Sequence, residues 1–257
     1  MTNLMYNTKD DTLINRAQLH QVVTPPPVGR FHRPVPFGEY VEVVDEALFS
    51  AGFEVTAEEY AVTKDGQRFF GMLEVAPKVL EGEYLPAKEF SFNVGVRGSH
   101  DQSIPRGIAL GTQVMVCSNL CFHGEMGTAS TKQTVNIYDR IVPMVHNAVG
   151  RLPELMEHQT KVFDQYKDYQ FGSKRHGDAA LVEIFRRGGF SAPQLARAIK
   201  EWDNPSYEEH LQYGDRSAWL LFNACTEALK PTGGHVNMDL VRARSQTAET
   251  FISEIIH

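Results

Sequence analysis

The spacing of hydrophobic residues changes once along the chain, near residue 137, and this change restricts the fold more than any other feature. Before it, apolar and polar residues alternate in several short runs, which is typical of strands with one buried face. Beyond it, apolar residues recur at the spacing of one helical face. Strands followed by helices indicate the α+β class. We therefore expect an antiparallel sheet in the N-terminal half, packed with a helical C-terminal half.

The same pattern divides the chain into three regions. Residues 1–36 show little periodicity, and the prolines at 25–27, 34 and 36 predict an extended, proline-rich arm. Residues 37–137 should form a β-rich core with one leading helix. Residues 138–257 should form a helical region that packs on this core, so that the whole chain behaves as one cooperative domain.

Turn and cap residues place the individual elements. A helix is predicted over 37–51, because Gly52 follows it at the C-cap position. Asp65 and Gly66 suit the tight turn of a hairpin with strands near 53–62 and 67–75. Ser191, with Gln194 three residues later, has the sequence signature of a capping box at a helix start. The remaining predicted elements are strands near 89–97 and 107–117, a long helix from Pro153, and helices over 178–187, 217–229 and 237–255.

Charge is distributed unevenly along the chain. The 257 residues carry a net charge of −7, which argues against a general polyanion binder if the charge is spread evenly. However, the stretch 12–38 contains no Asp or Glu, and the stretch 102–138 contains only Glu125. Burial of apolar strands explains part of the second stretch. The first is too rich in proline for this explanation.

Cysteine count and hydropathy indicate the compartment. Three cysteines are an odd number in a long chain and do not suggest the disulfide framework of a secreted protein. The first residues mix charged and amide side chains, unlike a signal peptide, and no apolar stretch has the length of a membrane span. We expect a cytoplasmic protein with no membrane partner.

The segment 97–125 contains the most reactive side chains. His100, Asp101, Cys117 and His123 lie near the ends of one predicted strand. One alternative is therefore a metal- or cysteine-dependent nucleic-acid-modifying enzyme that uses these four residues. However, the close spacing of the Cys and His residues is unusual for structural zinc, and neighbouring residues on a strand point to opposite faces. The sequence has no nucleotide-binding or hydrolase motif, so we expect no enzyme, cofactor or bound metal.

Binding of single-stranded nucleic acid requires cations along a groove and aromatic rings that stack on bases. Phe69 and Phe70 are adjacent, so one of them must leave the core side of a regular strand. The candidates lie on the polar face of the sheet, on its flanking loops, in the arm and in the helical half: Arg30, Arg33, Arg68, Phe70, Asn93, Arg97, His100, Arg106, Lys132, Lys174 and Arg175. A single Lys or Arg is usually a solvated surface charge, so the signal lies in their grouping.

The block RGSHDQSIPRGIALGTQVMVCSN, residues 97–119, resembles a phage- and plasmid-encoded family catalogued as a domain of unknown function. Members carry a Ser-His-Asp-x-Ser turn followed by a strand that ends in Val-Cys-Ser-Asn. The matching residues are Ser99, His100, Asp101, Ser103 and Val116, Cys117, Ser118, Asn119. AGFEV at 51–55 and RFFGMLEV at 68–75 also look like this family, so the resemblance covers about residues 38–145. Within this neighbourhood the chain is similar to the Drc family, the single-stranded DNA-binding RNA polymerase cofactors of lytic podoviruses that carry a virion RNA polymerase.

The resemblance implies a fold that binds single strands without an OB barrel. It also implies single-stranded DNA and a phage RNA polymerase as partners, in the cytoplasm of a bacterial host. Two alternatives stay open, namely the enzyme described above and a host-takeover interaction protein that docks through the arm and the helical half. Self-association is a further expectation, because the arm has apolar residues with no predicted element to bury them. These residues are Leu19, Val22, Val23, Val28 and Phe31.

Overall fold

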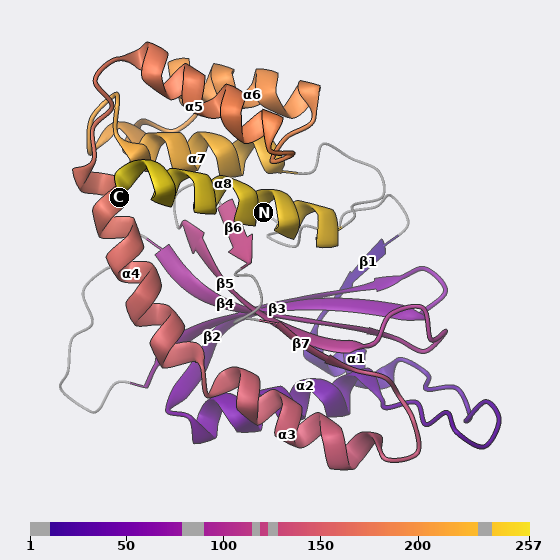
Figure 1. Cartoon of the computed structure of the whole chain (residues 1–257). Coiled ribbons are helices and arrows are strands. Elements are labelled where there is room, and N and C mark those ends of the chain that lie inside the picture. Colours follow the sequence, from indigo (N-terminus) through magenta and orange to yellow (C-terminus); the bar gives the residue numbers. More distant parts are fainter. Residues whose placement is uncertain (1–10, 79–89, 115–118, 123–127, 231–237) are drawn as a thin grey trace.

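A computed structural model describes residues 11–78, 90–114, 119–122, 128–230 and 238–257 (Figure 1). Across these ranges a seven-stranded antiparallel sheet has the order β1–β2–β3–β4–β5, with β6 and β7 both paired to β5. The sheet is open at its edges and not a closed barrel. Helices α2 and α3 cover one of its faces, and the C-terminal helices lie on the other side (Figure 1). The α+β class predicted from the sequence is therefore confirmed.

The element bounds follow the chain. The strands are β1 Asp11–Ile14, β2 Phe53–Thr63, β3 Arg68–Pro77, β4 Phe90–Ser99, β5 Arg106–Val114, β6 Asn119–Phe122 and β7 Thr128–Thr131. The helices are α1 Arg16–Gln21, α2 Phe37–Ser50, α3 Ile137–Val149, α4 Leu152–Asp168, α5 Lys174–Arg186, α6 Ala192–Asp203, the 3-10 helix η2 Glu208–Leu211, α7 Ala218–Leu229 and α8 Met238–Ile256.

One face of the sheet is strongly apolar, as its alternation predicts. Leu73, Val94 and Leu110 come from β3, β4 and β5, and each is completely buried. The register places Leu73 opposite Val94 and Val94 opposite Leu110, so the three side chains form a row across the sheet. Helix α2 covers this row with its own buried face, which includes Val44 and Leu48. Burial of these aliphatic side chains is the main force that holds helix and sheet together.

A group of aromatic rings forms the centre of the helical half. The Phe163 ring on α4 lies 5.4 Å from the Trp219 ring and 5.1 Å from the Phe222 ring, both on α7. Helix α4 runs from the α3 side of the sheet up to the C-terminal helices (Figure 1). A single cluster of buried apolar residues includes both these rings and the residues of the sheet.

The prediction of an extended arm over residues 1–36 is wrong for part of its length. Residues 1–10 lie outside the described ranges, β1 pairs with β2, and α1 follows it. Asn15 and Gln18 form a capping box that starts α1, and Leu19 is only 1% exposed in the core. Local alternation and capping therefore order this segment despite the prolines that follow it. Residues 22–36 contain no helix or ladder strand, apart from one isolated bridge between His32 and Thr134.

Other elements differ in extent. The capping box at Ser191 and the helices near 217–229 and 237–255 are confirmed. Helix α3 lies wholly before Pro153, where the first helix of the C-terminal half was expected. Helix α5 begins at Lys174, four residues earlier than predicted. Strands β1, β6 and β7 were not predicted, and each has only four residues. None of the helices in the described ranges combines the length and the apolar character needed to cross a membrane.

Candidate nucleic-acid interface

The polar face of the sheet is not the accessible surface that the sequence suggested. Phe70 and Arg97 are register partners and share this face, as predicted, while Phe69 turns to the α2 side. However, Phe70 is 7% exposed and Asn93 only 1%. The Asn93 side-chain amide donates a 3.2 Å hydrogen bond to the Ser91 hydroxyl. Both side chains are therefore buried in the structure, contrary to the expectation that Phe70 and Asn93 lie on an accessible face.

The charge of Arg68 is already offset by an acid. Its Nε and Nη2 lie 3.0 and 2.9 Å from Oδ2 of Asp101. Burial opposes ionisation of Asp101, but hydrogen bonds from Ser103, Ser99 and Arg68 outweigh it and hold the pKa of this carboxyl well below its usual range. Arg68 therefore helps to fix the turn after β4 and contributes little positive field.

His100 and Arg106 are also corrections to the predicted site. Arg106 is the first residue of β5, not part of a loop, and it is completely buried. His100 is 3% exposed, and its ring stacks on Phe37 with 4.0 Å between the ring centres. Burial lowers the pKa of His100 to about 4 and that of Arg106 to about 9. Neither side chain can reach a strand of nucleic acid bound at the surface.

The proposed enzyme cluster is only partly described. Cys117 and His123 lie outside the described residues. His100 points into the core while Asp101 bonds to Arg68 and Ser103 at the surface, so these neighbours do not form an acid–base pair. Within the described ranges no group of three or more His, Cys, Asp and Glu side chains is placed to hold a metal ion.

The two basic candidates in the helical half have different surroundings. The Lys174 ammonium donates a 2.5 Å hydrogen bond to the Trp202 carbonyl and lies 4.3 Å from the centre of its indole ring. Burial lowers the pKa of Lys174, and this side chain joins α5 to α6. Arg175, in the first turn of α5, is exposed.

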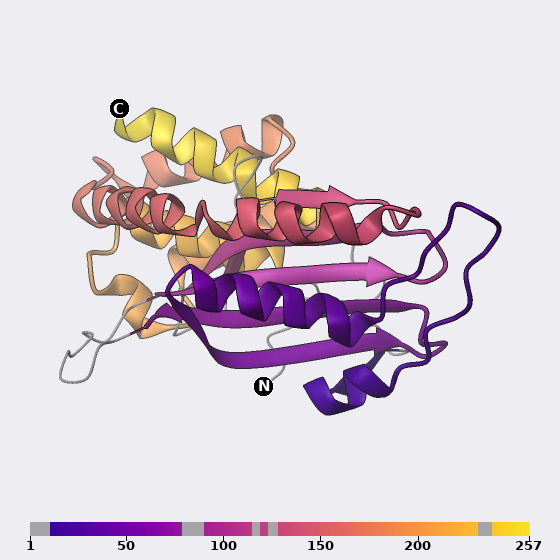
Figure 2. The ribbon, with the colours of Figure 1, turned by 90° about the horizontal axis from the view of Figure 1, so that it is seen from below.

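The arm and the segment after β7 are held side by side, although about 100 residues separate them in sequence. The Arg33 amide donates a 3.1 Å hydrogen bond to the Gln133 carbonyl. The Gln133 side chain accepts a 2.8 Å bond from the Val35 amide and donates a 2.5 Å bond to the Ser99 carbonyl. Figure 2 shows the indigo arm beyond the first turn of α3, at one end of the sheet. This contact brings together cations that the sequence suggested separately.

We call the resulting surface the arm patch. It consists of the exposed residues Arg30, Phe31, Arg33, Lys132, Tyr138 and Arg140. The Arg140 guanidinium donates a 3.0 Å bond to the Lys132 carbonyl, which draws the start of α3 towards the loop. Two acids accompany the four cations. The Tyr138 hydroxyl donates to Glu39 at 3.0 Å, and Asp139 is exposed in the same helical turn.

Two aromatic side chains of the arm patch were not predicted. Phe31 is 61% exposed and Tyr138 is 52% exposed. The Arg30 guanidinium lies 4.5 Å from the centre of the Phe31 ring. Single-strand binders use this combination of cations and rings for phosphate contacts and base stacking. The signal in the sequence was the position of both rings inside the acid-poor stretches.

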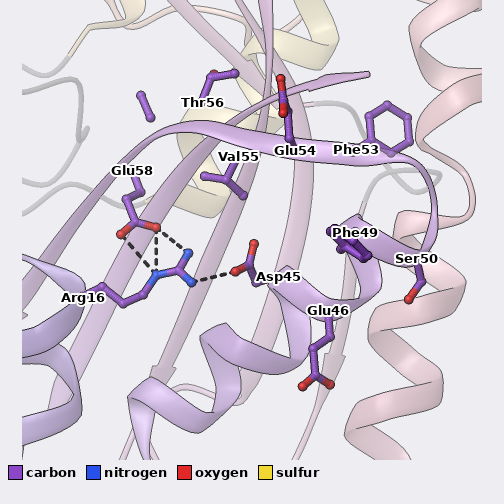
Figure 3. A pocket seen from close by; sticks show the side chains of 11 residues that line it. Arg16, Asp45, Glu46, Phe49, Ser50, Phe53, Glu54, Val55, Thr56 and Glu58 are labelled. Atoms are coloured by element: carbon purple, nitrogen blue, oxygen red, sulfur yellow. Dashed lines mark hydrogen bonds and ion pairs between the residues drawn. The ribbon is translucent and has the colours of Figure 1, made fainter. Parts of the chain in front are cut away.

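A large groove elsewhere has the opposite electrostatic character. It lies between the end of α2 and the start of β2 and has a volume of about 630 Å³. Asp45, Glu54 and Glu58 line it, and Arg16 points towards two of them (Figure 3). The hydrogen bonds of Arg16 to Glu58 and Asp45 outweigh its burial and keep its pKa above the ordinary value. With its cation paired and several carboxylates present, this groove repels a polyanion.

Comparisons with known proteins add no relative. No family model, curated protein or solved structure matches the chain.

Proposed function

We propose that this protein binds single-stranded DNA through the arm patch and acts as a transcription cofactor that recruits or assists a phage RNA polymerase. The observation that carries the DNA-binding part is the convergence of Arg30, Arg33 and Lys132. These three exposed cations come from the two acid-poor stretches, and the Arg33–Gln133 hydrogen bond holds those stretches together. The polymerase part rests on the resemblance of residues 97–119 to the phage family.

The geometry favours single strands over duplex. Phe31 and Tyr138 are exposed rings that can stack only on bases whose faces are accessible. The arm residues of the patch have irregular backbone, and α3 contributes only its first turn, so most of the patch is not a helix that can lie in a major groove. The proposed site therefore contacts phosphates and base faces and does not read sequence.

Salt dependence of DNA binding tests the proposal. Each phosphate contact on a single strand contributes about 0.7 to the slope of log affinity against log salt. Substituting Arg30, Arg33 and Lys132 by Ala should therefore flatten the slope by about 2 for a fluorescent oligothymidylate, measured by anisotropy. Phe31→Ala should weaken binding by about 1–3 kcal/mol with little change in slope, because stacking releases no counterions.

A matched control distinguishes this site from the rest of the surface. Lys161, Arg175 and Arg186 are three exposed cations on α4 and α5. Their joint substitution by Ala should leave the slope unchanged. A flattened slope in this control, with an unchanged slope in the arm variant, would place the DNA site on α4 and α5. Absence of single-strand binding by the intact protein would favour the host-takeover interaction protein instead.

A further inference from the structure

Four buried polar side chains gather around the paired rings of Phe37 and Phe69, beneath the arm. We call them the buried donor cluster: His32, Tyr40, His100 and Arg106, none more than 6% exposed. The Arg106 guanidinium carbon lies 4.7 Å from the centre of the Phe37 ring and 5.5 Å from that of Phe69. His100 stacks on Phe37, and Tyr40 meets Phe69 edge to face at 6.1 Å.

Arg106 carries a buried charge without a carboxylate partner among the described residues. Its Nη2 donates to the Val35 carbonyl. Its Nε and Nη1 have no hydrogen-bond partner in the described part of the chain. Burial lowers the pKa of this guanidinium to about 9, because desolvation disfavours the charged form. A charge removed from water without a partner is destabilising, and a counterion in contact with it offsets that cost.

The other members of the cluster add further unpartnered donors. His32 Nδ1 accepts a 3.3 Å bond from the Val28 amide, so the proton of the neutral ring is on Nε2. This Nε2, the Tyr40 hydroxyl and both ring nitrogens of His100 lack a partner in the described ranges. Burial raises the pKa of Tyr40, which keeps its hydroxyl protonated. A neutral His100 supplies one more N–H.

The acceptors nearby are already used. The Val35 carbonyl accepts a hydrogen bond from Arg106, and Oε1 of Gln133 accepts one from the Val35 amide. The Ser99 carbonyl accepts a hydrogen bond from the Gln133 side-chain amide. The groups left without partners are therefore mostly donors around one positive charge. Such a set is complementary to an anion and not to a cation.

We propose that Arg106 binds a small inorganic anion of the halide class inside the protein, with hydrogen bonds from the buried donor cluster. The ligand is small because the strand side of the guanidinium is closely packed. A Cβ at Gly98 would lie 2.1 Å from Nη1 of Arg106. The anion site does not overlap the arm patch, since the side chains of the patch are exposed and Arg106 is completely buried.

Thermal unfolding of the full chain tests the anion site. Sodium gluconate is replaced stepwise by sodium bromide at constant ionic strength. An anion that binds only the folded state raises Tm by about 5–10 °C when its concentration reaches about one hundred times Kd. Arg106→Met should abolish this rise. Arg68→Met, which changes a partly exposed arginine already paired with Asp101, should retain it.

Bromide also gives a test that needs no substitution, which matters because Arg106→Met can fail to fold. Crystals of the unaltered protein soaked in bromide should show an anomalous peak beside the Arg106 guanidinium. The proposal is overturned by equal Tm values in the two salts, by a rise that survives in Arg106→Met, or by bromide peaks that occur only at the protein surface.

Discussion

Replacement of His100 by Phe should remove a large part of the acid sensitivity of this protein. His100 is 3% exposed, and burial lowers its pKa from 6.5 to about 4. A phenylalanine at position 100 keeps a ring stacked on Phe37. The substitution removes no side-chain hydrogen bond within the described ranges, because both ring nitrogens of His100 lack partners there. At pH 7, where the histidine is neutral in both states, the variant should lie within about 1.5 kcal/mol of the unaltered protein.

The sign and size of the effect follow from proton linkage. Between pH 6.5 and about 4 the unfolded chain binds a proton at His100 and the folded chain does not, so the free energy of unfolding falls as pH falls. The loss amounts to about 2 kcal/mol at pH 5 and about 3 kcal/mol at pH 4. His100→Phe should shrink the difference between pH 7 and pH 4 by this amount.

Urea denaturation at a series of pH values in gluconate buffer measures the difference. His210 provides a matched comparison, because burial also lowers its pKa to about 4 and it lies in the helical half. His210→Phe should reduce the difference in free energy of unfolding between pH 7 and pH 4 by a similar amount. In the double variant the two reductions should add, since the sites are independent. An unchanged pH profile in His100→Phe would mean that this histidine is protonated in the folded protein, and the argument from burial would be refuted.

Three other outcomes are expected. Gln133→Leu should lower the free energy of unfolding by about 2–5 kcal/mol in urea denaturation, because it leaves two buried backbone groups without partners. Gly177→Ala should lower the free energy of unfolding by about 1–3 kcal/mol in the same assay, since a Cβ there would lie 2.1 Å from the Trp202 ring. Val23→Ser with Val28→Ser should lower the mass measured by light scattering if these exposed arm residues bury against a second copy; an unchanged mass would assign them another role.

The sequence predicts most of the fold because its signals are local. The alternation of apolar and polar residues predicted the ends of β2, β3 and β4 to within about two residues. The C-cap glycine and the capping box at Ser191 act over a few residues and were also correct. Helix α3 was missed because Pro143 interrupts its pattern, although Ile137, Ile141 and Val145 keep a spacing of four residues.

Exposure of the candidate residues could not be predicted in the same way. Alternation tells which face a side chain occupies, so the shared face of Phe70 and Arg97 was correct. It does not tell whether another layer covers that face, and Phe70 is buried. Arg106 shows that an error of one residue in a strand boundary is enough to change the predicted exposure of a side chain. The strand was predicted to begin at residue 107, and a start one residue earlier moves this arginine from a loop into the core.

The arm patch depends on contacts that no local pattern contains. Arg33 and Lys132 meet because Gln133 bonds to the arm through both its backbone and its side chain. The same side chain bonds to the Ser99 carbonyl, so the arm is fixed to the end of β4 before any ligand arrives. Ligand binding then loses less conformational entropy than it would with a free arm. Because the inner side of this arm also supplies the Val35 carbonyl to Arg106, an anion that stabilises the buried donor cluster would stabilise the arrangement of the outer cations as well.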